Sequence, residues 1–200
     1  MKNFKLLLAA LVAVVSISSC MKDDNNYDGP SWEEEQARID SVLDKQKSIV
    51  EAYAREHLSE EKIMKNDSLG IWYEVLPSTV DSTFEYVQSG NSFMTVSASV
   101  KYSEKGITGD YSKEVTTATR ASILQGYVPT AWLVAFYPDN INGKYYPGLL
   151  GKGLLKGSKI RVIAPSPYYY DNNEVKDADG NVLPANTPVD FTIEVIDISR

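Results

Sequence analysis

Side chains that act as nucleophiles or bind metals are scarce in this chain. Among 200 residues it holds one cysteine, Cys20, and one histidine, His57. Zinc sites and cysteine–histidine nucleophile pairs use several such side chains together, so we expect no metal and no cofactor. Residues 177–181 resemble the start of a calcium loop, but Pro188 stands where the bidentate glutamate would be. The Asp-Gly pair in this segment predicts a polar hairpin turn instead.

Cys20 follows a segment that is typical of bacterial export signals. Lys2 and Lys5 precede an apolar run over residues 6–15, which is too short to span a bilayer. The letters Ile-Ser-Ser-Cys resemble a relaxed lipobox, which implies cleavage before the cysteine and lipid attachment to it. An ordinary signal peptide with an incidental cysteine is the alternative. We therefore expect a lipoprotein signal peptide over residues 1–19 and a membrane anchor at Cys20.

The residues after the cysteine and the overall charge bear on where the protein acts. Residues 21–24 resemble the acidic export signal that sends lipoproteins of Bacteroides-like bacteria to the outer face of the outer membrane. We therefore expect an outer-membrane lipoprotein exposed at the cell surface. The chain has 20 basic and 27 acidic residues, a net charge of −7, and no cluster of Lys or Arg. We expect no nucleic-acid binding, because phosphate neutralisation needs a basic patch.

The mature chain begins with a tether and a helix. Residues 20–30 are polar and rich in turn formers, which predicts a flexible tether. Residues 31–66 predict a helical segment that starts with a capping box at 31–34, continues to about residue 56 and adds a turn over 60–65. Its apolar stripe consists of Ile39, Val42, Leu43, Ile49, Val50 and Tyr53. The stripe packs either on the domain that follows or on a second copy in a homodimer.

From residue 67 onward the pattern changes to strands. Strands are predicted over residues 71–76, 94–102, 160–164 and 189–195. The second and fourth alternate apolar and polar residues, so each has one buried face. One short helix is predicted to begin at Pro129, because proline suits the first helical position. An antiparallel sheet with one helix against it is an α+β arrangement.

Five segments in this part of the chain resemble consecutive parts of FKBP-type peptidyl-prolyl isomerases. They are LGIWYEVL (69–76), VSASVKYSEKGITGDY (96–111), VPTAW (128–132), GSKIRVIAPSPYYY (157–170) and LPANTPVDFTIEVID (183–197). The resemblance covers residues 68–199 and rests on all five segments in the right order. It implies an FKBP-like domain over residues 67–200, in which an antiparallel half-barrel sheet wraps one short helix.

The resemblance also implies an aromatic pocket between the sheet and the helix. Its residues would be Tyr102, Tyr111, Val128, Trp132, Tyr170 and Phe191. Trp132 would form the floor, and Tyr170 would supply a hydroxyl at the rim. Such a pocket holds a proline ring and eases rotation about a peptide bond, whose barrier is about 18–20 kcal/mol for ordinary amides. It needs no nucleophile, because it binds the twisted amide more tightly than the planar one. The implied partner is a proline-containing peptide or an exported protein, and the implied role is that of an isomerase or chaperone.

Three positions depart from the pattern of active isomerases. Pro129 stands where a backbone N–H would bind the substrate carbonyl, and proline has no N–H. Ser112 stands where an aspartate would follow the aromatic residue of the bend. Asp171 replaces the glycine after the rim tyrosine. We therefore expect a protein that binds peptide or protein with weak or no isomerase activity.

An insertion over about residues 133–153 lengthens the chain after the predicted helix start. It carries Tyr137, Tyr145 and Tyr146 among Asn-Gly and Pro-Gly turn signals. Tyrosine buries much area with few rotatable bonds, so these residues suit a binding surface beside the pocket. A self-packed loop is the alternative interpretation. The alternative function is thus a non-catalytic surface module that binds a glycan or partner protein through the insertion.

Overall fold

The computed structural model describes residues 29–89, 92–141 and 144–200. Cys20, the predicted signal peptide and most of the predicted tether lie outside the described residues. The chain divides into two compact units, Met1–Glu35 and Gln36–Arg200. In the first unit, the Glu34 amide donates to the Ser31 hydroxyl (3.2 Å), and the Ser31 amide donates to the Glu34 carboxylate (2.7 Å). This reciprocal pair is the predicted capping box.

The second unit is built on a sheet whose neighbouring strands, among the described residues, are all antiparallel. In spatial order these strands are β1 (Met64–Asn66), β2 (Ile71–Val75), β9 (Lys159–Ala164), β12 (Val189–Ser199), β5 (Val96–Gly106) and β6 (Ser112–Ile123). The sequence predicts β2, β5, β9 and β12 correctly, β5 and β12 by their alternation, but it does not predict β1 or β6.

Short two-stranded pairs lie outside the main sheet. They are β3 (Gln88–Ser89) with β4 (Ser92–Phe93), β7 (Asn140–Ile141) with β8 (Lys144–Tyr145), and β10 (Val175–Lys176) with β11 (Val182–Leu183). The pair β10–β11 is the hairpin predicted at the Asp-Gly turn. Within that turn the Asp177 carboxylate accepts the backbone amides of Asp179 (3.0 Å) and Asn181 (2.8 Å).

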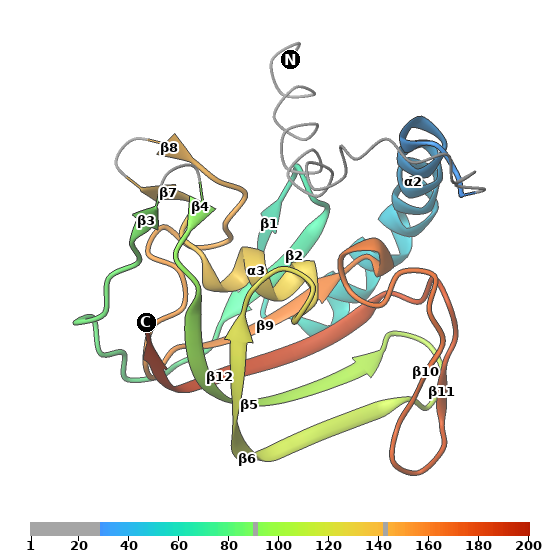
Figure 1. The fold of residues 1–200 in the computed structure, drawn as a ribbon. Coiled ribbons are helices and arrows are strands. Elements are labelled where there is room, and N and C mark those ends of the chain that lie inside the picture. Colours follow the sequence, from blue (N-terminus) through green and yellow to red (C-terminus); the bar gives the residue numbers. More distant parts are fainter. Residues whose placement is uncertain (1–28, 90–91, 142–143) are drawn as a thin grey trace. The chain divides into compact units, whose positions relative to one another are not determined.

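Helix α3 (Thr130–Phe136) lies against one face of the sheet, which we call the inner face (Figure 1). Alternate residues of two long strands are buried on this face: Val96, Ala98 and Val100 in β5, and Phe191, Ile193 and Val195 in β12. The predicted α+β arrangement of a sheet around one short helix is therefore confirmed. Pro129 differs slightly from the prediction. Its ψ of 149° is extended, so it precedes the first helical residue instead of occupying that position.

Strand β6 bends where it passes Lys101 of β5. Val100 pairs with Thr119 whereas Tyr102 pairs with Val115, so residues 116–118 of β6 oppose a single residue of β5. Extra residues on one strand of an antiparallel pair form a bulge that bends and twists it. In Figure 1 the ribbon of β6 changes direction at this point. The bend turns the second half of β6 toward the side of the sheet that holds α3.

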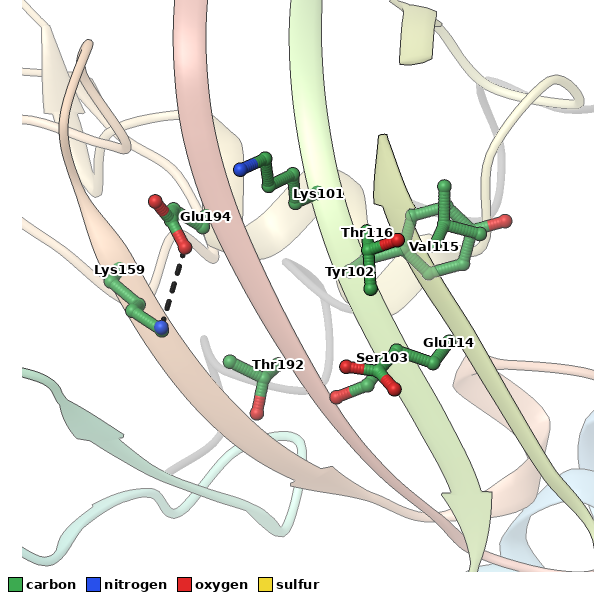
Figure 2. A pocket seen from close by; sticks show the side chains of 9 residues that line it. All are labelled: Lys101, Tyr102, Ser103, Glu114, Val115, Thr116, Lys159, Thr192 and Glu194. Carbon is green, nitrogen blue, oxygen red and sulfur yellow. Dashed lines mark hydrogen bonds and ion pairs between the residues drawn. The ribbon is translucent and has the colours of Figure 1, made fainter. Parts of the chain in front are cut away.

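The opposite, outer face of the sheet has an open region and a covered region. The open region is a hollow of about 220 Å³ over β5, β6, β9 and β12 (Figure 2). It is lined by Lys101, Tyr102, Ser103, Glu114, Val115, Thr116, Lys159, Thr192 and Glu194. Lys159 and Glu194 form an ion pair there at 3.3 Å. These side chains are mostly polar, and Val115 and Tyr102 are the large apolar groups among them.

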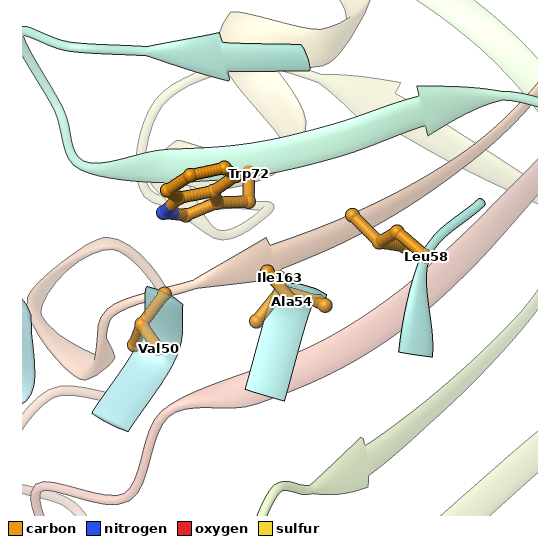
Figure 3. Packing of buried hydrophobic residues seen from close by; sticks show 5 residues of the cluster. All are labelled: Val50, Ala54, Leu58, Trp72 and Ile163. Atoms are coloured by element: carbon orange, nitrogen blue, oxygen red, sulfur yellow. The ribbon is translucent and has the colours of Figure 1, made fainter. Parts of the chain in front are cut away.

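Helix α2 (Trp32–His57), from Gln36 onward, packs on the outer face at β2 and β9. Val50, Ala54 and Leu58 form a buried cluster with Trp72 of β2 and Ile163 of β9 (Figure 3). The helix therefore packs on the domain that follows it, which is one of the two predicted outcomes. The homodimer stays a prediction. No helix among the described residues is long and apolar enough to cross a membrane.

The buried stripe of α2 differs in part from the predicted one. Gln46, Val50 and Ala54 are buried at four-residue spacing, whereas Ile49 is 51% exposed. Several faces of a helix can carry apolar residues at spacings of three and four, and contact with the sheet selects one of them. The helical turn expected over residues 60–65 lies at residues 59–63 instead, where the Ser59 carbonyl accepts the amides of Lys62 and Ile63, each at 2.9 Å, and β1 then begins at Met64.

Candidate functional site

A cavity of about 540 Å³ opens on the inner face, between helix α3 and the bent pair β5–β6. It is lined by Val100, Tyr102, Glu104, Lys113, Thr119, Arg120, Ala121, Ser122, Tyr127, Val128, Pro129, Trp132, Tyr169 and Tyr170. Four residues of the predicted pocket are in this lining, namely Tyr102, Val128, Trp132 and Tyr170. The other two, Tyr111 and Phe191, are each 1% exposed and do not line the cavity. The structure thus brings four of the six together around one space.

Trp132 forms the apolar floor of the cavity. Its side chain is 5% exposed, and its ring meets the Tyr102 ring edge-on at a centroid distance of 5.1 Å. The indole N–H donates to the Tyr169 hydroxyl at 3.3 Å. Tyr169 in turn packs on Phe191 at 5.1 Å. Phe191 therefore supports the floor from below, one layer away from the cavity.

A buried carboxylate, Glu104, organises the tyrosines of the cavity. It is 3% exposed, and its Oε1 accepts the hydroxyls of Tyr111 and Tyr170, each at 2.6 Å. Its Oε2 accepts the hydroxyl of Tyr169. Burial first, and then the Glu104 carboxylate, raise the pKa of all three hydroxyls above the usual tyrosine range. The three tyrosines therefore stay protonated at neutral pH.

These hydrogen bonds decide what the tyrosines can offer a ligand. A tyrosine hydroxyl has one hydrogen, and in Tyr169 and Tyr170 that hydrogen is directed to Glu104. Their oxygen lone pairs remain as acceptors. The resemblance assigns Tyr170 a rim hydroxyl. The structure shows that this hydroxyl has already donated its hydrogen within the protein.

Glu104 also bears on the aspartate that is absent at Ser112. Ser112 lies at the start of β6, and its amide donates to Asp177 at 3.2 Å. A carboxylate nevertheless reaches the tyrosines, because Glu104 supplies it from the neighbouring strand β5. Sequence reasoning missed Glu104 and Tyr169. The signal for Glu104 was the alternation of β5, since continuing it by two residues beyond Tyr102 places Glu104 on the inner face.

Lys113 adds a positive charge to the cavity wall. Its Nζ lies 5.2 Å from the centre of the Tyr102 ring and 3.7 Å from the Glu104 carboxylate. Partial burial would lower the pKa of Lys113. Hydrogen bonding to the Tyr102 hydroxyl and the charge of Glu104 outweigh this effect and raise that pKa above its usual range. The cavity thus holds a charged ammonium group beside its aromatic floor.

The lip of the cavity is formed by the residues that lead into α3. Tyr127 is 76% exposed, and Val128 and Pro129 are half-buried. The carbonyl of Pro129 accepts the Trp132 amide at 2.9 Å and so belongs to the first turn of the helix. Because Pro129 has no N–H, this position offers the cavity no backbone donor.

Comparison with known proteins finds similar structures but no matching sequence family. No protein-family model matches the chain, and no curated protein matches its sequence. Among solved structures, the chain is similar to FkpA from Escherichia coli, with 16% identity, a TM-score of 0.51, and coverage of 98% of this chain and 81% of that chain. It is also similar to a peptidyl-prolyl cis-trans isomerase from Pseudomonas syringae pv. tomato (16% identity, TM-score 0.48, 79% of this chain and 96% of that one). A further similar structure is AtFKBP13 (17% identity, TM-score 0.47, 69% of this chain and 99% of that one).

The fold is FKBP-like. At identities below 20% the likeness concerns the fold alone, and the function has to be argued from the site itself.

The predicted insertion surface can now be placed on this FKBP-like fold. The Tyr137 hydroxyl donates to the Ile123 carbonyl at 2.7 Å, and the Gln88 amide donates to the Tyr146 hydroxyl. Tyr145 is 74% exposed. Two of the three tyrosines therefore hold the segment against the domain. Tyr145 is the one that presents its ring to solvent.

Proposed function

We propose that this protein is a lipid-anchored, FKBP-like protein of the bacterial envelope that binds a proline-containing segment of a peptide or exported protein, with weak or no isomerase activity. The cavity over Trp132 supports the binding role. It joins a buried aromatic floor to walls that carry polar and charged side chains, among them Lys113 and Arg120, and polar groups of this kind can orient a bound ligand. The charged Lys113 and the tyrosine lone pairs would orient the backbone of the bound segment.

The single observation that carries the weak activity is the loss of two specific donors to a substrate carbonyl, the backbone N–H at position 129 and the Tyr170 hydroxyl. Pro129 has no N–H at the lip, and the hydrogen of the Tyr170 hydroxyl is bound to Glu104. An isomerase of this kind acts by stabilising the twisted amide, so each lost donor reduces the stabilisation of the transition state. One lost donor costs about 1–3 kcal/mol, which slows a reaction about 5- to 150-fold.

The membrane attachment rests on the sequence around Cys20. A lipobox-like segment ends at the only cysteine of the chain. Each buried CH₂ group of an attached acyl chain contributes about 0.8 kcal/mol, so several chains on one residue give stable anchoring. The acidic residues that follow support an outer-membrane location at the cell surface. Mass spectrometry of the purified protein would show the mass of a lipidated Cys20, and replacing Cys20 with Ala should abolish it.

An isomerase and binding assay tests the role of the cavity. The full chain, purified in detergent, is assayed on a prolyl tetrapeptide, together with Trp132→Leu, Pro129→Ile and the control Trp72→Leu. Trp72 is equally buried but lies on the outer face, so its variant reports on the loss of an indole as such. We expect peptide binding that Trp132→Leu abolishes and Trp72→Leu retains. We also expect a rate near the uncatalysed one, which rises in Pro129→Ile because a backbone N–H is restored.

Two results would contradict the proposal. If the wild-type chain binds no prolyl peptide, the cavity is not the proposed site. If the wild type shows a high rate that Trp132→Leu removes and Pro129→Ile does not increase, the weak-activity part is wrong, because the missing donors would then not matter.

A further inference from the structure

The rim of the cavity is attached to helix α2, which lies on the other face of the sheet. We define the rim segment as residues 166–171, which comprise the short 3₁₀-helix η1 (Ser166–Tyr168) followed by Tyr169, Tyr170 and Asp171. Gln46 of α2 is 6% exposed, and its Oε1 accepts the Ser166 amide at 2.8 Å. Its Nε2 donates to the Ser166 hydroxyl at 2.8 Å. It also donates to the Asn186 carbonyl at 2.7 Å.

A second contact holds the end of the rim segment. The Arg38 guanidinium of α2 donates to both carboxylate oxygens of Asp171, at 3.1 and 2.5 Å. Asp171 has a φ of +52°, a left-handed conformation that costs a non-glycine residue about 1–2 kcal/mol. A two-pronged Arg–carboxylate pair restricts geometry as well as adding energy. Helix α2 therefore holds a strained turn in place directly after Tyr170.

The rim segment continues this chain of contacts to the floor of the cavity. Tyr169 accepts the indole N–H of Trp132, and both Tyr169 and Tyr170 donate to Glu104. From α2 to the floor, the steps are hydrogen bonds of buried or half-buried residues, joined by the backbone of the rim segment itself. A displacement of α2 would move the turn at Asp171, then the two tyrosines, and then the hydrogen bond to Trp132.

We infer that Gln46 and Arg38 are positioning residues through which helix α2 controls the geometry of the cavity. The effect on a ligand rests on the proposed function, whereas the coupling itself does not. In sequence, α2 is the element that follows the predicted tether. A force or a partner that displaces α2 therefore changes the affinity of the cavity for its peptide ligand.

The two buried indoles allow this coupling to be measured without a ligand. Trp132 lies below the rim segment on the inner face, and Trp72 lies below α2 on the outer face. Each gives its own indole N–H signal in an NMR spectrum of the ¹⁵N-labelled full chain in detergent. The variants are Gln46→Leu, Arg38→Ala and Arg38→Lys. The control is Arg55→Ala, which removes an ion pair with Glu51 of the same helix and a contact with Trp72 (5.0 Å).

We expect Gln46→Leu and Arg38→Ala to shift the Trp132 signal. In Arg38→Lys the signal should lie closer to its wild-type position than in Arg38→Ala. Arg55→Ala should shift the Trp72 signal alone. In the same samples, binding of a prolyl tetrapeptide should weaken about fivefold in the first two variants, a typical size for coupling between sites. If Arg38→Ala keeps the Trp72 signal of a folded chain and leaves the Trp132 signal unmoved, the inference is wrong. If the Trp132 signal moves but the wild type binds no peptide, the coupling holds and the proposed function fails.

Discussion

Replacing Glu104 with glutamine removes one acceptor from the centre of the tyrosine network. The carboxylate accepts three hydroxyls through its two oxygens, whereas an amide has one oxygen and one NH₂ group. Tyr111 and Tyr170 share Oε1, so an amide oxygen placed there can still serve both. The Tyr169 hydroxyl would then face an amide donor while it already accepts the Trp132 indole N–H. Its own hydrogen would have no acceptor in a buried site.

The size of this effect follows from the burial of the group. Leaving a buried donor unpaired costs about 1–3 kcal/mol. For a unit of this size, each kcal/mol lowers the melting temperature by about 2–4 °C. We therefore expect Glu104→Gln to melt about 2–12 °C below the wild type. Glu114→Gln is the matched control, because Glu114 is a solvent-exposed glutamate on the neighbouring strand, and it should cost less than about 0.5 kcal/mol.

Urea denaturation followed by tryptophan fluorescence measures both variants. A third variant adds Tyr169→Phe to Glu104→Gln, which removes the hydroxyl that lost its acceptor. Tyr169→Phe also leaves the buried Trp132 indole N–H without its acceptor, so the double variant should recover none of the lost stability. If Glu104→Gln unfolds at the same urea concentration as Glu114→Gln, Glu104 does not hold the three hydroxyls, and the argument that they cannot donate to a ligand fails.

Two further predictions concern stability. At Gly153 (φ +68°) a Cβ would lie 2.1 Å from the Phe136 carbonyl oxygen, so Gly153→Ala should cost about 2–5 kcal/mol from backbone strain and overpacking together. At Gly180 (φ +86°) no atom lies within 4 Å, so Gly180→Ala should cost only about 1–2 kcal/mol; equal losses in thermal melts would contradict the described packing. Burial, helped by the charge of Asp40, raises the pKa of Tyr168 to about 12, against about 10 in an unfolded chain. As the pH rises, the unfolded state therefore loses the Tyr168 proton before the folded state does. The stability that the protonated Tyr168 contributes is present below pH 10 and is lost as the pH rises through 12. Tyr168→Phe should show a smaller loss of stability between pH 9 and 11 in urea titrations, and an unchanged loss would refute the assignment.

Much of the fold follows from local rules that a sequence displays directly. Period-two alternation predicts β5 and β12, and the capping box marks the start of α2. The Asp-Gly pair predicts the β10–β11 hairpin, and the proline before Trp132 marks the start of α3. These signals need only neighbouring residues, because backbone geometry and turn chemistry act over a few positions.

Other features depend on residues that are far apart in the sequence. Ile49 and Gln46 lie on the same helix, and their types alone favour burial of the isoleucine. The glutamine is buried because Ser166 and Asn186, more than a hundred positions away, present the groups that its amide can pair with. In the same way, a glutamate in a strand is usually expected to face solvent. The alternation of β5 directs Glu104 inward, and its burial is tolerated because the turn after β5 and a distant loop bring hydroxyls to it.

The sequence by itself thus determined most of the long elements, their order, and three of the aromatic residues that line the cavity, Tyr102, Trp132 and Tyr170. Only the tertiary structure decided which polar groups are buried among them and what these groups can still donate. The physical reason is that a strand or turn is favoured by its own residues, whereas a buried polar group is tolerated only when its partners arrive from elsewhere in the fold.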